Sequence, residues 1–412
     1  MNNFLVHNED TKKEMCREIG IGTMDDLFKQ IPEAARMKSL DLPDALSEME
    51  TQKRVKALAK KNKTDYISFL GGGIYNKFVP ACISQIAQRF EFLTAYTPYQ
   101  PEISQGTLQV MYEFQTMVCR LTNMDIANAT VYDAATACAE AILMSVRIKK
   151  LDKVLVANSL NPEYKKVVET YTQSNSIQVE WFDTIPDDTK DYACVLVQTP
   201  NYFGEIIEIA KPIDTLLVVC TDISTLSVLK PVECDIMVGD IQTLGIPMSF
   251  GGPSAGFMAC KEQYMRQLPG RLAGRTLDAE GKQAFTLTIQ TREQHIKREK
   301  ATSNICSNQA LIGLCATLYL SVMGEKGFKQ AGYLSSKYAH ELGKKLEAKD
   351  IKTLNKNFFN EFVIEVADAD KTLANLKANG IIGGLKLDNN KILVATTEMN
   401  SPEEIDLYAK AL

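Results

Sequence analysis

Between residues 66 and 260, short apolar runs rich in β-branched residues alternate with amphipathic helical runs. The apolar runs lack the alternating pattern of a sheet with one face in water, so we expect a mostly parallel sheet covered by helices on both faces. The predicted strands are Lys153–Asn158, Ile177–Trp181, Tyr192–Gln198, Leu216–Cys220, Asp235–Val238 and Gly256–Cys260. The predicted helices are 105–121, with Ser104 as a candidate N-cap, 135–149 and 162–173. This pattern predicts an α/β domain.

The regions on either side have a different character. Residues 1–65 are interpreted as a charged helical arm, whose basic helix at Lys53–Lys63 has either a solvated face, which we favour, or a specific anion site. A long apolar helix at Gln309–Met323 ends at Gly324. A small α+β domain follows, with strands at Glu361–Val366 and Lys391–Thr396 and helices at 335–348, 369–378 and 402–412. The predicted division is an N-terminal arm at 1–65, a large domain at 66–305, and a linking helix with a small domain at 306–412.

Charge, cysteine spacing and hydropathy argue against several classes of protein: nucleic-acid-binding, metal-binding, secreted and membrane proteins. A formal charge of −5 argues against nucleic acid as the main partner, because release of counterions from phosphates needs a basic face. The ten cysteines form no CxxC pair and no zinc-ribbon spacing, so we expect buried reduced thiols and no metal site. The first residues lack a signal-peptide pattern, and no apolar run approaches the roughly 20 residues that cross a bilayer. We therefore expect a cytoplasmic protein without a membrane part.

Three short segments are candidates for anion binding. The glycine-rich runs Phe69–Gly73 and Phe250–Pro253 match neither common nucleotide-binding pattern, and we interpret them as tight turns or close backbone approaches. In Tyr132–Ala137, small residues open a helix and leave its first backbone N–H groups accessible to a phosphate. A capped core helix is the favoured interpretation of the same residues.

Two further segments are unusually polar. Thr94–Gly106 holds two tyrosines, two prolines and two glutamines just before a helix, and rigid loops of this kind often line sites. A rigid surface loop is the alternative. Thr291–Asn304 is dense in ionisable side chains, which fit either a solvated helical turn or a polar network at an interface or cleft.

Together with Gly245–Pro253, Ile305–Ala310 and Asn360–Phe362, these segments resemble the glycine-cleavage P-protein family, in particular subunit 1 of its two-subunit form. The matching segments keep the same order over nearly the whole chain. The resemblance implies an α/β, fold-type I pyridoxal-phosphate-dependent transferase-like large domain, a small C-terminal α+β domain, and sites at a subunit interface. It also implies that this chain, with subunit 2, decarboxylates glycine, releases CO₂ and passes the aminomethyl group to the lipoyl arm of H-protein, in a heterotetramer.

The same resemblance bears on which subunit holds the cofactor. The chemistry needs a lysine that binds pyridoxal phosphate as a Schiff base and a ring that stabilises the carbanion left by CO₂. In the family's cofactor-binding half this lysine lies four residues before an Ile-Pro pair, which puts Gln242 at its position here. Between Lys230 and Lys261 the sequence has no lysine, arginine or histidine. We therefore expect the partner subunit to bind the cofactor covalently. The vestigial positions in this chain are Asp133, Thr136, Asp222 and Gln242.

We expect this chain to contribute residues that line part of the partner subunit's active site or that form the interface between the subunits. The candidate residues, none of them catalytic by itself, are Tyr96, Tyr99, Gln100, Glu102, Ser104, Gln105, Arg292, His295, Asn304, Asn360 and Glu361. Tyr96 and Tyr99 would position substrate or orient the cofactor ring, while Glu102 and Gln105 would fix the loop. Packing between subunits explains the same residues equally well. Two alternatives stay open, a purely structural scaffold subunit and an independent pyridoxal-phosphate aminotransferase or lyase with an unorthodox lysine.

Overall fold

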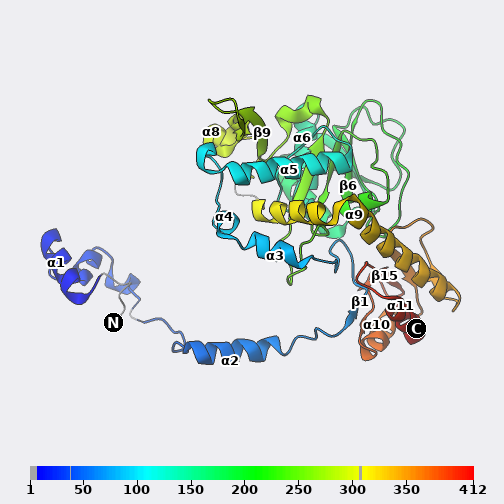
Figure 1. Cartoon of the computed structure of the whole chain (residues 1–412), viewed down its shortest axis with the longest axis horizontal. Coiled ribbons are helices and arrows are strands. Elements are labelled where there is room, and N and C mark those ends of the chain that lie inside the picture. The colour runs from blue at the N-terminus through cyan, green and yellow to red at the C-terminus, as the bar shows by residue number, and fades with distance from the viewer. Residues whose placement is uncertain (1–6, 38, 306–308) are drawn as a thin grey trace. The chain divides into compact units, whose positions relative to one another are not determined.

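The computed structural model describes residues 7–37, 39–305 and 309–412 (Figure 1). Residues 1–6, residue 38 and Cys306–Asn308 lie outside the described residues, and the last three belong to the segment Ile305–Ala310 that carries part of the family resemblance. The chain divides into two compact units, Met1–Thr64 and Asp65–Leu412. None of the described helices is both long and apolar enough to span a membrane.

The first unit is helical, as the sequence predicts for the arm. Helix α1 (Glu9–Ile19) is capped by Asn8, whose side chain accepts hydrogen bonds from two backbone N–H groups, and it ends at Gly20 with φ of +81°. Helix α2 (Glu48–Ala59) begins with a capping box between Ser47 and Glu50. All residues of α2 are exposed within its unit, which agrees with the solvated-face interpretation of the basic helix.

The second unit contains a seven-stranded sheet in the order β2-β8-β7-β6-β5-β3-β4. All its pairs are parallel except those that β8 makes with β7 and β2. The six predicted strands all occur, with ends shifted by at most two residues. Their bounds are β3 Lys153–Ala157, β4 Gln178–Phe182, β5 Cys194–Gln198, β6 Leu216–Asp222, β7 Ile236–Asp240 and β8 Gly256–Cys260; β2 is Ile126–Ala127. The prediction of a mostly parallel sheet is confirmed.

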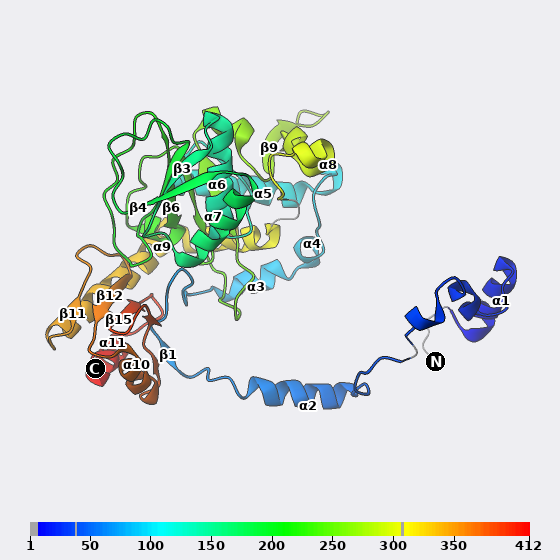
Figure 2. The same cartoon turned by 180° about the vertical axis from the view of Figure 1, so that it is seen from behind.

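Helices cover both faces of this sheet (Figures 1 and 2). Along β3, Val154 and Val156 pack into the core formed with α6 (Ala134–Lys149) and α7 (Pro162–Ser174). The alternate residue Leu155 packs into the core on the other face, with α5 (Gln105–Thr122) and the start of α9 (Ala310–Glu347). Both sides of each central strand are thus buried, which explains why the strands are apolar throughout. Ser104 precedes α5 as predicted, but its side chain makes no capping hydrogen bond.

Three short elements lead into the sheet, and a hairpin follows it. Strand β1 is Ile67–Ser68, and helices α3 and α4 are Ala81–Ala87 and Phe90–Leu93. The antiparallel hairpin of β9 (Leu272–Leu277) and β10 (Gln283–Thr288) was not predicted from the sequence. The short helix α8 (Gln294–Lys297) comes next.

Helix α9 (Ala310–Glu347) connects to the C-terminal sheet. Gly324 has non-helical angles, φ 58° and ψ −176°, so the predicted end at this residue is a kink, after which helical structure resumes. The predicted helix at 335–348 is therefore the end of a longer one. The C-terminal sheet has the order β11-β12-β15-β14. Its elements are β11 Lys352–Thr353, β12 Glu361–Glu365, α10 Ala369–Ala378, β13 Ile381–Ile382, which pairs with β1, β14 Leu385–Lys386, β15 Lys391–Ala395 and α11 Pro402–Ala411. The division into domains at residue 305 stays a prediction.

Candidate functional site

A small pocket lies at the carboxyl ends of β5, β6 and β7, the edge at which parallel α/β sheets usually bind ligands. Its volume is about 30 Å³, which leaves room for a few water molecules at most. The lining residues are Gly73, Tyr75, Ala134, Tyr164, Gln198, Pro200, Asn201, Gly204, Cys220, Thr221, Asp222, Thr225, Asp240, Phe359, Asn360 and Glu361. The pocket therefore brings together the vestigial position Asp222 and the interface candidates Asn360 and Glu361.

Gln242 lies beside this pocket and is only 2% exposed. Its Nε2 donates to the carbonyl oxygens of Tyr75 at 3.0 Å and Ile246 at 2.8 Å, and its Oε1 accepts from the backbone N–H of Tyr75 at 3.0 Å. All three bonds join backbone groups, so the amide fastens the segment around Tyr75 to the turn after β7. A carboxamide in this place can hold the fold together, but it cannot bind an aldehyde cofactor covalently.

Asp222 ends β6, and its carboxylate is already well supplied with donors. It accepts from the backbone N–H and the hydroxyl of Ser224, both at 2.9 Å, and from the Thr243 hydroxyl at 2.8 Å. The side chain thereby caps the short helical turn that follows the strand. The structure thus gives Asp222 a local structural role at the pocket's edge.

Two buried carboxyl groups, Asp240 and Glu361, face the same pocket. Burial raises the pKa of Asp240 to about 7, although hydrogen bonds from the Ser254 hydroxyl and two backbone N–H groups oppose the rise. Burial likewise raises the pKa of Glu361 to about 7, against hydrogen bonds from the Gly72 N–H at 2.6 Å and the Tyr75 hydroxyl at 3.0 Å. At neutral pH each group is therefore partly protonated. Asp240 was not singled out from the sequence, although a polar residue ending an apolar parallel strand is a usable signal.

The glycine-rich run before Tyr75 closes the pocket. A Cβ on Gly71 would overlap Oε1 of Glu361 and lie 2.6 Å from Cβ of Ala395. Gly72 has φ of +87°, and its carbonyl accepts from Asn161 Nδ2 at 3.0 Å. The interpretation of this run as a tight turn with close backbone approach is confirmed, because both features need a residue without a side chain.

This pocket does not fit a covalently bound pyridoxal phosphate. No lysine is among its described lining residues, and its volume of about 30 Å³ is far below that of a ligand pocket, typically about 300 Å³ or more. In their ionised form, the carboxyl groups of Asp222, Asp240 and Glu361 also disfavour a phosphate by charge repulsion. We therefore assign no cofactor chemistry to it.

The anion candidate at Tyr132–Ala137 forms the capped start of α6. Asp133 Oδ1 accepts from the backbone N–H of Thr136 at 2.7 Å, so this N–H group is already bonded. Thr136 is 7% exposed, and the first turn is buried in the core. The favoured interpretation of a capped core helix agrees with these contacts.

The loop at Thr94–Gly106 lies at the surface and is tied down at its end. Gln105 Oε1 accepts from the Phe285 N–H at 2.8 Å, while its Nε2 donates to the carbonyl oxygens of Phe285 at 2.8 Å and Pro101 at 2.6 Å. Tyr96 is 79% exposed and Tyr99 41% exposed. Gln100 and Glu102 are exposed as well, and Ser104 is half-buried. The loop thus presents aromatic side chains on a fixed base.

The polar segment 291–304 contacts this loop, so two candidate segments meet although they are far apart in sequence. The His295 ring lies 4.9 Å from the Tyr99 ring, and Figure 1 shows α8 beside the start of α5. Arg292 is 8% exposed and donates to the carbonyl oxygens of Gly270 at 3.0 Å and Ile289 at 3.1 Å. These contacts agree with the polar-network interpretation of the segment.

The structure does not bring every candidate to one place. Asn304 is exposed. Asn360 is buried at the pocket and donates to the carbonyl oxygen of Thr396 at 3.1 Å. Arg271, which the sequence analysis did not single out, lies under the loop and contacts Thr97 and Tyr99. No local pattern marks this arginine, because its partners are distant in sequence.

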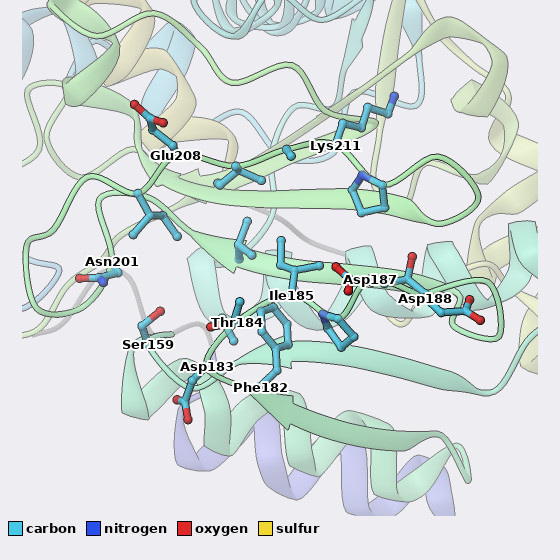
Figure 3. Close-up of a pocket in the computed structure, with 18 of the residues that line it drawn as sticks. Ser159, Phe182, Asp183, Thr184, Ile185, Asp187, Asp188, Asn201, Glu208 and Lys211 are labelled. Atoms are coloured by element: carbon cyan, nitrogen blue, oxygen red, sulfur yellow. The ribbon is translucent and has the colours of Figure 1, made fainter.

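A larger cavity, of about 840 Å³, lies elsewhere, beside the ends of β3, β4 and β5 (Figure 3). The long connections at 183–190 and 205–214 form much of its lining, and Lys211 there pairs with Asp235 at 2.9 Å. None of the predicted site residues is among its described lining residues. Nor do the described residues contain a group of three or more His, Cys, Asp or Glu suited to a metal ion.

Comparison with known proteins identifies the family. The family profile described as "Glycine cleavage system P-protein" matches residues 2–412. The chain belongs to the glycine cleavage system P-protein family. The "Probable glycine dehydrogenase (decarboxylating) subunit 1" of Geobacillus thermodenitrificans is 43% identical over 442 aligned positions, covering 100% of this chain and 99% of the relative. The protein of the same name from Desulforamulus reducens is 44% identical, with 99% of each chain covered.

Solved structures extend the comparison to the P-protein fold. A crystal structure of glycine decarboxylase (P-protein) of the glycine cleavage system, in inhibitor-bound form, matches with a TM-score of 0.92 and 36% identity over 100% of both chains. Glutamate decarboxylase from Lactobacillus brevis matches with a TM-score of 0.65 and 12% identity over 93% of this chain and 97% of that one, which shows the fold alone. The resemblance to subunit 1 of the P-protein and the fold-type I prediction are both confirmed. The homologues are named as a component of an enzyme.

Proposed function

We propose that this chain is the non-anchoring subunit of a two-subunit glycine-decarboxylating enzyme. A partner, P-protein subunit 2, holds pyridoxal phosphate covalently, and the complex releases CO₂ from glycine and loads the aminomethyl group on the lipoyl arm of H-protein. The observation that carries this proposal is Gln242, whose amide is fully engaged with the backbone of Tyr75 and Ile246 where the resemblance implies a lysine. The closed pocket around it supports the same assignment, with Asp133, Thr136 and Asp222 as remnants of a shared ancestral site.

The loop before α5 is the part of this chain proposed to meet the partner. Large apolar side chains are exposed along it and the preceding helix: Phe90 (77%), Leu93 (50%), Tyr96 (79%), Tyr99 (41%) and Ile103 (76%). Clustered exposure of this kind is typical of an interaction surface. The loop therefore supplies apolar area for the interface and two phenol hydroxyls that can hold substrate in the partner's site.

Other candidate residues contact this loop or its end and hold it in place. Gln105 fixes its end through β10, and His295 packs against Tyr99. Arg292 fixes the backbone of the neighbouring turn. Asn360 and Glu361 stay second choices as interface residues, because both are turned into the closed pocket.

Substitution of the tyrosines tests the wall role in the reconstituted complex with H-protein. We expect Tyr96→Phe and Tyr99→Phe to lower glycine–CO₂ exchange by about tenfold, the effect of one lost polar contact of about 1.4 kcal/mol to the reacting groups. Tyr333→Phe is the matched control, because Tyr333 is another exposed tyrosine, 56% exposed, and belongs to α9 and not to the loop. Unchanged exchange in a complex that still assembles would favour the purely structural scaffold.

Borohydride reduction tests where the cofactor binds. The isolated chain is incubated with pyridoxal phosphate, reduced and mapped by peptides, and we expect no specifically labelled lysine. A single labelled lysine would instead support the independent aminotransferase or lyase. Exchange that appears only when this chain is mixed with a co-purified partner of similar fold is the expected positive result.

A cytoplasmic location and a heterotetramer of two subunit pairs complete the proposal. The nine described cysteines are free thiols, most of them buried, which suits a reducing compartment. Size-exclusion chromatography with light scattering on the mixed subunits measures the assembly.

A further inference from the structure

Arg271 lies beneath the surface loop that the proposed function assigns to the partner's site. The residue is only 4% exposed and directly precedes β9. Its Nη2 donates to the Thr97 hydroxyl at 3.2 Å, and its guanidinium carbon is 5.7 Å from the centre of the Tyr99 ring. One buried cation thus contacts two residues of a loop that lies more than 170 positions earlier in the chain.

An acidic side chain also lies close to the guanidinium. Glu293 Oε2 lies 3.9 Å from Arg271 Nε and 3.7 Å from His295 Nδ1. The side chain of Glu293 is 11% exposed, and that of Arg271 5%. His295 packs its ring against Tyr99 at 4.9 Å. We call Arg271, Glu293 and His295 the Tyr99 clamp, because Arg271 and His295 contact Tyr99 and Glu293 lies within 4 Å of both.

The backbone that carries the clamp is itself fixed to the core of the unit. Arg292 donates to the carbonyl oxygen of Gly270, the residue before Arg271. The carbonyl oxygen of Arg271 accepts from the N–H of Ala129 at 3.1 Å. Gly270 has φ of +81°, a conformation that a side chain would strain. The guanidinium therefore approaches the loop from a rigid base.

We propose that Arg271 is a positioning residue, which fixes the Thr97–Tyr99 turn in the conformation needed at the partner's site before the subunits meet. The inference rests on the proposed function of the loop as a wall of that site. A loop ordered in advance does not lose conformational freedom on assembly, and its side chains act from defined places. The planar guanidinium donates to Thr97 through one nitrogen while it lies over the Tyr99 ring, and the compact ammonium of lysine does not reproduce this geometry.

The test compares variants of this chain in the complex with the partner subunit and H-protein. We expect Arg271→Met to lower kcat for glycine–CO₂ exchange by about tenfold to about 100-fold, the range of effects of a displaced site residue, with assembly unchanged. We expect Arg271→Lys to lower kcat less than Arg271→Met does, because the ammonium keeps the positive charge but not the planar arrangement of N–H donors. Arg275→Met is the matched control, as Arg275 is on the same strand and exposed.

A second variant guards against a simple folding defect and tests the contact itself. Thr97→Val removes the hydroxyl to which Arg271 donates, and Thr97 itself is half-buried. If the contact carries the effect, the double variant Arg271→Met/Thr97→Val loses no more than Arg271→Met alone. Additive losses, or a normal kcat in both single variants, would overturn the positioning role.

The tyrosine variants separate this inference from the function on which it rests. If Tyr99→Ala lowers kcat while Arg271→Met does not, the loop is a site wall and the positioning role alone fails. If Tyr99→Ala leaves kcat unchanged in an assembled complex, the loop is not a wall of the partner's site. The positioning role proposed for Arg271 is then refuted as well.

Discussion

The buried carboxyl group of Glu361 makes the stability of this chain depend on pH. Burial raises its pKa from the ordinary 4.5 to about 7, so the folded protein binds this proton more tightly than the unfolded chain does. Between these two values the unfolded state releases the proton first. Stability is therefore greatest below pH 4.5 for this group and falls as pH rises to about 7.

The size of the effect follows from the same two pKa values. From about pH 5.5 to about pH 8, linkage gives a loss of about 2 kcal/mol from the free energy of unfolding for Glu361. In Glu361→Gln that group no longer titrates, while the amide oxygen can still accept from the Gly72 N–H and the amide nitrogen can donate to the Tyr75 hydroxyl oxygen. Relative to wild type, we expect the variant to gain about 2 kcal/mol over this pH range.

Urea denaturation of wild type and Glu361→Gln at both pH values, followed by circular dichroism, measures this difference. Glu365→Gln is the matched control, because Glu365 ends the same strand with a side chain 41% exposed. The free energy of unfolding of Glu365→Gln should change with pH as much as that of wild type. Parallel curves for Glu361→Gln as well would refute the reasoning, since they would mean that burial does not raise the pKa of Glu361.

Two further substitutions test the packing around the closed pocket and the C-terminal sheet. Gly71→Ala should destabilise the chain by about 1 to 3 kcal/mol in urea denaturation, because its Cβ overlaps Glu361, whereas Gly106→Ala, with nothing within 4 Å, should change little. Lys77→Met should cost about 3 to 5 kcal/mol in the same assay, since it leaves the carboxylate of Glu398, 3.1 Å from Lys77 Nζ and 7% exposed, buried without its cation. Adding Glu398→Gln should recover part of that loss, and equal losses in the single and double variants would contradict a buried ion pair.

The strands of the central sheet were predictable because their signal is local. Runs such as Leu216–Cys220 are short, rich in β-branched residues and apolar at every position, as expected for a strand buried on both faces. The hairpin of β9 and β10 was missed because β9 is buried at Leu272 and Ala273 but exposed at its far end, so no complete period appears. The predicted end of the helix at Gly324 was wrong, because only this one residue leaves the helical conformation and α9 continues to Glu347.

The candidate site was predictable in part. The loop and the polar segment were each marked by composition, but their meeting at Tyr99 and His295 joins residues almost 200 positions apart. Asp240 carries a local signal, a polar residue at the end of an apolar strand, but Arg271 carries none because its partners are distant in sequence. Their roles come from neighbours that only the folded chain supplies.

The sequence by itself determined the family, the α/β class and the glutamine at position 242, because periodicity, motif order and residue identity are all local properties. The tertiary structure decided what that glutamine does. Gln242 reaches Tyr75 across 167 positions of sequence, and Glu361 reaches Gly72 across 289. Such contacts depend on how the sheet, the glycine-rich segment and the C-terminal strands pack together, and no short stretch of sequence encodes that packing. From the sequence, the absence of a lysine at position 242 indicates only that no cofactor is bound covalently there. The packing shows in addition that the pocket beside Gln242 is nearly filled, with a volume of about 30 Å³.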